Sequence, residues 1–168
     1  MESVIDMLVN AAIQRIKSAT HDISDEYSKA ECVNFLNNAI QQIASLLISA
    51  KYPNIVKEIT LLDGETLPSN FMNTCGTYPI RITDNKATLL DDLTSIRFRY
   101  FATPDRLTGE SETEQLPFDH DGLNEAVVQV AILLAKNENE YDITSDSALY
   151  QQLQASIAAG MLGQNAPK

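Results

Sequence analysis

The residues of this chain that could carry out chemistry are few, and the most suggestive group surrounds one of its two histidines. His120 stands between Asp119 and Asp121, and the other histidine, His21, lies in a polar stretch. Carboxylates on both sides of an imidazole are compatible with a metal site or with acid–base catalysis. The same pattern is typical of a helix start, where carboxylates lie beside free backbone amides. We favour the helix start, capped by Asp119 or Asp121, because Asp-His-Asp-Gly supplies only a fragment of a calcium-binding loop.

Two further groups of carboxylates have the composition of cation ligands. They are the pair Asp91-Asp92 and the alternating residues Glu110, Glu112 and Glu114, which lie in a Ser/Thr/Gly-rich stretch. Acidic residues in such stretches are usually solvated side chains. We therefore predict no metal ligands in either group.

Motifs that define common enzyme sites are absent from the sequence. It contains no Gly-rich nucleotide loop, no HExxH and no GxSxG. Cys32 and Cys75 form no CxxC pair and are expected to be unpaired thiols. A nucleophile would also need a base and an orienting group close by. The sequence thus predicts a protein that is not an enzyme and that has no cofactor.

The composition describes a folded acidic protein. The chain has 168 residues, 44% of them hydrophobic, and its 23 acidic and 12 basic side chains give a formal net charge of −11. This charge argues against a protein that binds nucleic acid tightly, because such binding depends on Lys and Arg neutralising phosphates. It permits an acidic surface past which DNA moves without being held. No apolar run reaches the length of a membrane span and Met1-Glu2-Ser3 is no secretory start, so we expect a cytoplasmic, membrane-free protein.

Helical spacing of apolar residues predicts four main helices. The second has the clearest pattern, begins with a capping box of Ser28 and Glu31, and is expected to end near Tyr52-Pro53. The third is apolar nearly all round, and the fourth should stop at Gly160. The four are expected over residues 3–18, from Ser28 to about Tyr52, from about Asp121 through Leu134, and from about Ser145 to Ala159.

The middle of the chain predicts short strands. The clearest one, Ser95–Thr103, alternates apolar residues with Arg97 and Arg99, which therefore lie on one face. These arginines either face solvent or meet acidic groups on a neighbouring copy or a tail partner. Further strands are expected over 55–62, 78–83 and 87–90. The expected fold is α+β and helix-dominant, with a small antiparallel β-sheet inserted between the second and third helices.

We expect this fold to form a single domain over residues 1–160. Its β-rich insertion should span about 54–118, and residues 161–168 should form a flexible C-terminal tail.

Three stretches of the sequence resemble the head–tail connector (portal-binding adaptor) proteins of tailed bacteriophages. The first is Asp25–Ser28 leading into Phe35–Ile43, which is similar to the family's second helix with its Leu-Asn-x-Ala centre. The second is Leu67-Pro68-Ser69-Asn70-Phe71, similar to a Leu-Pro-x-x-Phe element. The third is Leu116–Val127, similar to the entry to the penultimate helix. The likeness covers about Asp25 to Ala159 and rests on the order and type of elements.

The resemblance implies a structural virion protein at the neck of the particle, assembled in the host cytoplasm. Identical subunits, expected to number twelve, would form a ring under the portal protein, and a tail or nozzle protein would attach on the far side. Ile157, Met161 and Leu162 would be the apolar anchors that dock into the portal. DNA would pass through the ring during ejection without specific binding, and the acidity would either repel DNA from the channel wall or keep the free subunit dissolved.

Three alternatives remain beside the connector interpretation. The chain could be a tail-completion or neck protein that never touches the portal, or a cytoplasmic helical adaptor protein. The least favoured alternative is an enzyme that uses Asp119, His120 and Asp121.

Overall fold

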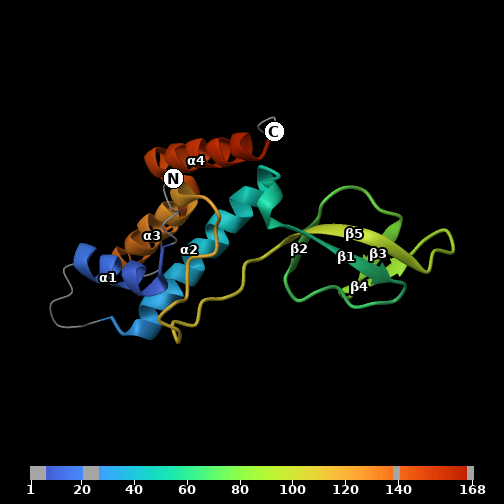
Figure 1. The fold of residues 1–168 in the computed structure, drawn as a ribbon, viewed down its shortest axis with the longest axis horizontal. Coiled ribbons are helices and arrows are strands. Elements are labelled where there is room, and N and C mark those ends of the chain that lie inside the picture. The colour runs from blue at the N-terminus through green and yellow to red at the C-terminus, as the bar shows by residue number, and fades with distance from the viewer. Residues whose placement is uncertain (1–6, 21–26, 138–140, 166–168) are drawn as a thin grey trace. The chain divides into compact units, whose positions relative to one another are not determined.

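The structure is a computed structural model that describes residues 7–20, 27–137 and 141–165, with side chains described as far as Met161. The chain divides into two compact units (Figure 1). Unit 1 comprises Met1–Leu47 and Asp105–Lys168, and unit 2 comprises Ile48–Pro104. Unit 2 corresponds to the β-rich insertion expected over 54–118, but residues 105–118 belong to unit 1 as a long loop.

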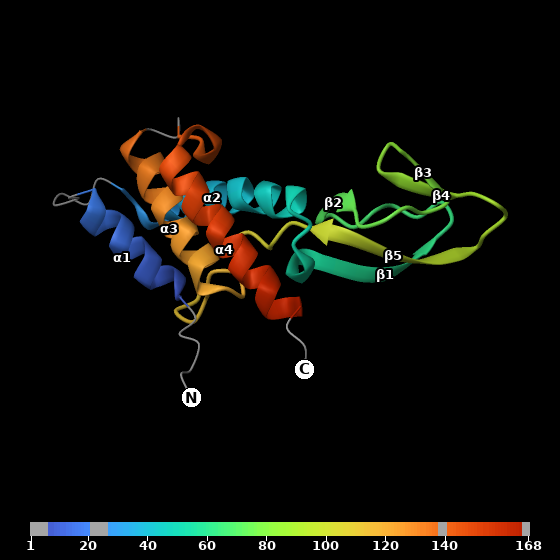
Figure 2. The same cartoon turned by 90° about the horizontal axis from the view of Figure 1, so that it is seen from above.

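Unit 1 is built from helices. They are α1 (Val9–Ala19), α2 (Lys29–Ser49), α3 (Asp121–Lys136) and α4 (Ser147–Asn165), with a short 3-10 turn at Ile143–Ser145 before α4. Helix α3 packs against both α1 and α4, as Figure 2 shows. Its apolar residues are buried on most sides, which confirms its expected place in the core.

The apolar stripe of α2 produces the helix and its buried face as predicted. Its members at steps of three and four residues are all buried, and Ser28 Oγ accepts a hydrogen bond from the backbone N–H of Glu31 at 3.1 Å. This bond is one half of the expected capping box. The buried stripe comprises Val33, Leu36, Ile40, Ile43 and Leu47.

Unit 2 holds two antiparallel sheets. A three-stranded sheet has the order β1-β5-β2, and strands β3 and β4 form a separate two-stranded hairpin. The bounds are β1 Val56–Leu62, β2 Phe71–Thr74, β3 Ile80–Thr83, β4 Lys86–Leu89 and β5 Ser95–Ala102.

An aromatic cluster forms the core of unit 2. Phe98 is fully buried and its ring lies 5.9 Å from that of Tyr100 and 5.0 Å from that of Tyr78. Leu61, Leu67, Ala87 and Ala102 are further buried members of the cluster. Since strand residues alternate between faces, the buried Phe98 and Tyr100 leave Arg97 and Arg99 on the opposite, exposed face of β5.

The fold class is confirmed: the described residues form four helices, with antiparallel β-structure between α2 and α3. Several details differ from the sequence-based expectation. Helix α1, expected over residues 3–18, begins at Val9, with Met7 and Leu8 outside the helix and residues 3–6 outside the described residues. Strand β2 was not predicted, and α4 continues through Gly160 to Asn165, so the helix stop expected at Gly160 is wrong. Gly160 is buried, and packing at this point outweighs the usual cost of a glycine within a helix. No helix in the described part of the chain is long and apolar enough to cross a membrane.

Candidate functional site

The histidine between two aspartates is a helix cap. Nδ1 of His120 accepts a hydrogen bond from the backbone N–H of Gly122 at 3.1 Å, and His120 itself is the N-cap residue of α3. The expectation that Asp119 or Asp121 caps this helix is therefore wrong, because the imidazole nitrogen satisfies the free amide instead. Among the residues that the structure describes, no three His, Cys, Asp or Glu side chains are grouped so that they could hold a metal ion. His21 lies outside the described residues.

The acidic loop has an internal structural role. The two carboxylate oxygens of Glu114 accept hydrogen bonds from the backbone N–H groups of Thr108 (3.1 Å) and Gly109 (2.7 Å). Its backbone oxygen accepts the N–H of Val9 at 2.8 Å, which ties the loop to the start of α1. Glu110 and Glu112 are exposed. The sequence suggested that Glu114 is a solvated side chain. In the structure it instead holds the loop together through these hydrogen bonds.

Two asparagines fix the ends of the same loop. The side chain of Asn37 in α2 accepts the backbone N–H of Leu107 at 2.8 Å and donates to its C=O at 3.1 Å. Asn124 in α3 accepts the N–H of Phe118 at 3.1 Å and donates to its C=O at 2.8 Å. Both asparagines are buried. Each amide therefore pairs with one loop residue as a neighbouring β-strand would, and we call this arrangement an amide clamp.

The role of the clamp asparagines was not predicted from the sequence, although both residues lie in the stretches that carry the connector resemblance. Asn37 lies in Leu36-Asn37-Asn38-Ala39, and Asn124 lies in Leu123-Asn124-Glu125-Ala126. The signal was available: the same Leu-Asn-x-Ala string occurs in both helices, with a polar residue inside an apolar stripe. A buried amide at such a position needs hydrogen-bond partners.

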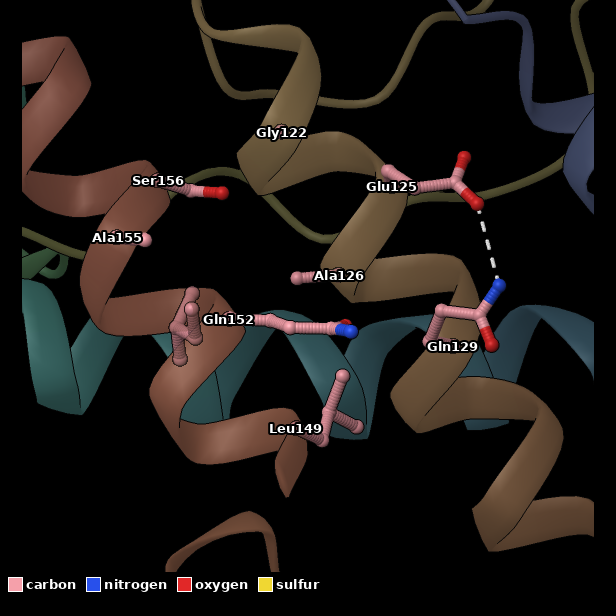
Figure 3. Close-up of a pocket in the computed structure, with 9 residues that line it drawn as sticks. Gly122, Glu125, Ala126, Gln129, Leu149, Gln152, Ala155 and Ser156 are labelled. Carbon is pink, nitrogen blue, oxygen red and sulfur yellow. Dashed lines mark hydrogen bonds between the residues drawn. The ribbon is translucent and has the colours of Figure 1, made fainter. Parts of the chain in front are cut away.

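A groove of about 330 Å³ runs between α3 and α4 (Figure 3). Its lining is mostly small and apolar, with polar groups from Glu125, Gln129, Gln152 and Ser156. Gln129 donates to Glu125 at 3.1 Å, the interaction drawn in Figure 3. The lining contains no imidazole and no thiol.

The carboxylate of Glu125 in this groove forms an ion pair with Arg15. Both guanidinium nitrogens of Arg15 donate to Glu125, each at 2.6 Å. This bidentate hydrogen bonding lowers the pKa of Glu125 below its usual range, against the opposing effect of partial burial. A carboxylate held ionised and hydrogen-bonded on both oxygens is a poor general base. Glu125 therefore acts in this groove as one side of an ion pair.

The three expected docking residues have different environments. Ile157 is only 2% exposed and contributes to the packing of unit 1, so in this conformation it has almost no surface to offer a partner. Met161 is half-buried. The side chain of Leu162 lies outside the described residues.

The two arginines of β5 lie on an exposed sheet face. Arg97 contacts Glu58 of β1 at 3.3 Å, with 87% of the Arg97 side chain exposed. Arg99 makes no ion pair with any residue that the structure describes. Together with Thr60 and Leu62 of β1, these residues form what we call the open sheet face: Glu58, Thr60, Leu62, Arg97 and Arg99.

The net charge is distributed unequally between the two units. Unit 2 contains six basic and six acidic residues and is neutral. The other six basic and seventeen acidic residues belong to unit 1, so the whole charge of −11 falls there. The helix α4 has no charged residue at all.

Comparisons with known proteins do not place the chain in a family. No protein-family model matches it, and no curated protein is significantly similar to it.

Proposed function

We propose that this protein is a structural subunit of a bacteriophage neck, a head–tail connector that assembles as a ring under the portal protein and carries the tail or nozzle. The observation that carries the proposal is the confinement of the net charge of −11 to unit 1, with a neutral unit 2. An acidic helical unit at a channel wall repels DNA phosphates, so DNA passes without being held. A neutral β-rich unit approaches other protein surfaces without that repulsion.

Two further features support a binding role over a catalytic one. The carboxylates and the imidazole that first suggested chemistry act as a helix cap, a loop organiser and one side of an ion pair. The order of helices, antiparallel strands and helices is the order on which the resemblance to connectors rests. A ring of twelve copies remains part of the proposal.

The proposed portal contact lies at the end of α4. Met161 is half-buried there, and the following residues to Asn165 continue the helix without charge. Apolar side chains at an uncharged helix end suit insertion into a groove of a partner protein. Docking therefore involves Met161 and Leu162, with Ile157 supporting them from within the core.

The test is capture of the full-length chain by the portal protein encoded in the same genome. Met161→Glu and a truncation that removes residues 162–168 should each abolish ring formation on the portal, as seen by electron microscopy. The matched control is Met72→Glu, which alters a half-buried methionine in β2 of unit 2. Normal docking of both α4 variants, with circular dichroism spectra unchanged, would contradict the assignment of the portal contact.

A chain that never binds the portal, although it binds a tail protein, would instead support a neck protein away from the portal. Failure to bind either would support a cellular adaptor.

A further inference from the structure

Large apolar side chains are exposed at one end of unit 2. Of the five most exposed in the described part of the chain, four belong to this unit: Leu62 (52%), Ile82 (41%), Leu90 (39%) and Leu93 (37%). Leu62 ends β1 opposite Ser95, and the N–H of Asp63 donates to the C=O of Thr94 at 3.3 Å. Leu62 and the turn that precedes β5 therefore lie at the same end of the sheet, and clustered exposed leucines are typical of a contact surface.

The turn before β5 presents two carboxylates between two leucines. Asp91 and Asp92 both have φ near +59°, and the N–H of Leu93 donates to the C=O of Leu90 at 3.2 Å. Residues with a side chain rarely adopt this backbone region, although Asp tolerates it better than most. We call Leu90–Leu93 the tip turn. It fixes an apolar–acidic–acidic–apolar order in an exposed position, and neither aspartate makes an ion pair with a residue that the structure describes.

The open sheet face is complementary to the tip turn. It offers Arg99 without an ionic partner among the described residues and Arg97 with a single exposed contact to Glu58 at 3.3 Å. The exposed Leu62 lies on the same face. Arg97 is the diagonal neighbour of Leu62, and Arg99 lies two residues farther along β5, opposite Glu58. The face thus offers two basic groups, one carboxylate and a leucine to the two carboxylates and two leucines of the tip turn.

We propose that the tip turn of one copy docks onto the open sheet face of the next copy. The carboxylates of Asp91 and Asp92 then pair with Arg97 and Arg99, while Leu90 and Leu93 cover Leu62. Complementary charge fixes the register of such a contact. Because the two surfaces differ, the contact is head-to-tail, and a head-to-tail contact closes into a ring when its rotation permits. This inference rests on the proposed ring and names its subunit contact.

The contact is small and exposed, so the free protein should associate weakly. Sedimentation velocity of the full chain at rising concentration should therefore show a mass above that of one chain. Arg97→Glu/Arg99→Glu places an acidic sheet face opposite the acidic tip turn. Asp91→Lys/Asp92→Lys places a basic tip turn opposite the basic sheet face. Each double variant alone should weaken self-association at least about tenfold, since like charges that face each other across an interface are strongly unfavourable.

A mixture of the two double variants gives the sharpest outcome. The lysine tip of one variant meets the glutamate face of the other, and the unaltered acidic tip meets the unaltered basic face. Equimolar mixing should therefore restore association, with strictly alternating copies. Asp91→Asn/Asp92→Asn removes the charge while keeping a residue that accepts positive φ, and it should weaken association even if the lysine variant disturbs the turn. Matched controls with the same charge changes are Glu110→Lys/Glu112→Lys and Arg81→Glu/Arg106→Glu, all at exposed positions.

Several results would overturn the inference. They are a mass of one chain at every concentration, unchanged association of the reversed variants, or a mixture that fails to recover. Portal capture is measured separately, so a chain that self-associates through these surfaces but ignores the portal would overturn the proposed function alone. A chain that docks on the portal without this contact would overturn the contact alone.

Discussion

At the scale of single residues, the most consequential side chains are amides. The side-chain amides of Asn37 and Asn124 each pair with the backbone N–H and C=O of one loop residue. The amide of Gln42 pairs with the C=O of one residue and the N–H of another. It donates to the C=O of Tyr141 and accepts the N–H of Ile143, both at 3.0 Å. Buried backbone groups need such partners because leaving one unpaired costs about 1–3 kcal/mol. Helix side chains therefore hold the ends of these loops, in addition to Glu114 and the backbone pairing of residues 114–116 with the start of α1.

Replacing Asn37 tests this account. Asn37→Ala leaves the N–H and C=O of the buried Leu107 without their partner and should lower the free energy of unfolding by about 1–3 kcal/mol. Asn34→Ala, at an exposed position of the same helix, is the control. Urea denaturation monitored by circular dichroism measures both variants. An equal effect of the two substitutions would show that the clamp contributes nothing.

The ion pair of Arg15 and Glu125 predicts a pH dependence. The pKa of Glu125 is lower in the folded chain than its ordinary value of 4.5, because Arg15 donates to both of its oxygens. The stabilisation is therefore present above pH 4.5 and is lost as the pH falls through the lowered pKa. Both side chains are nearly half exposed, so the contribution is below about 1 kcal/mol.

Glu125→Gln should accordingly lose less stability than the wild type between pH 6 and pH 3. Urea midpoints at several pH values give the comparison. Glu112→Gln, at an exposed position of the acidic loop, should follow the wild type. A parallel pH profile for Glu125→Gln would contradict the role of the pair.

At the scale of elements, periodicity predicted the helices and the longest strand because each places many apolar residues on one face. The stripe of α2 and the alternation of β5 are examples. Strand β2 was missed because it has four residues and pairs with β5 through an irregularity between Phe71 and Asn73. The end of α4 was missed because Gly160 is buried, a tertiary fact that local composition does not carry. The alternation of β5 predicted that Arg97 and Arg99 share one face. The groove could not be predicted in this way, because it depends on how α3 and α4 pack in three dimensions.

The approach of α3 to α4 can be tested at Gly122. A Cβ at this position would lie 2.6 Å from Ser156 Oγ and 3.0 Å from Ser156 Cβ. Gly122→Ala should therefore destabilise unit 1 by about 1–3 kcal/mol through overpacking. In a Ser156→Gly background the same change should cost less, since the two Ser156 atoms are gone and only His120 Cε1, at 3.0 Å, still lies close to the added Cβ. The double-mutant cycle measures this coupling, and additive effects would contradict the close contact.

At the scale of the whole molecule, charge separates the two units. Unit 1 carries the full net charge of −11 and unit 2 carries none. Like charges destabilise a compact state by repulsion, and dissolved ions screen that repulsion. The two units should therefore respond differently to salt, although they belong to one chain.

Hydrogen exchange resolved by residue measures this difference. Raising the salt concentration from about 20 mM to about 500 mM should slow exchange of buried amides in α2 and α3, since the Debye length shrinks to a few ångströms. Amides of β1 and β5 should change little. Glu110→Lys/Glu112→Lys reduces the charge of unit 1 and should reduce its response to salt. An equal response of both units would contradict the proposed electrostatic difference.

The insertion of unit 2 between residues 47 and 105 has a consequence for synthesis on the ribosome. Unit 2 is continuous, so it can fold as soon as Pro104 has emerged. Helix α2 is made earlier, but the unit in which its apolar face is buried also contains α3, which is complete only at Lys136. At about 5–20 residues per second, that wait lasts roughly 4 to 18 seconds. The nascent chain thus exposes the apolar stripe of α2 while its own middle folds, and this interval is when it depends most on chaperones.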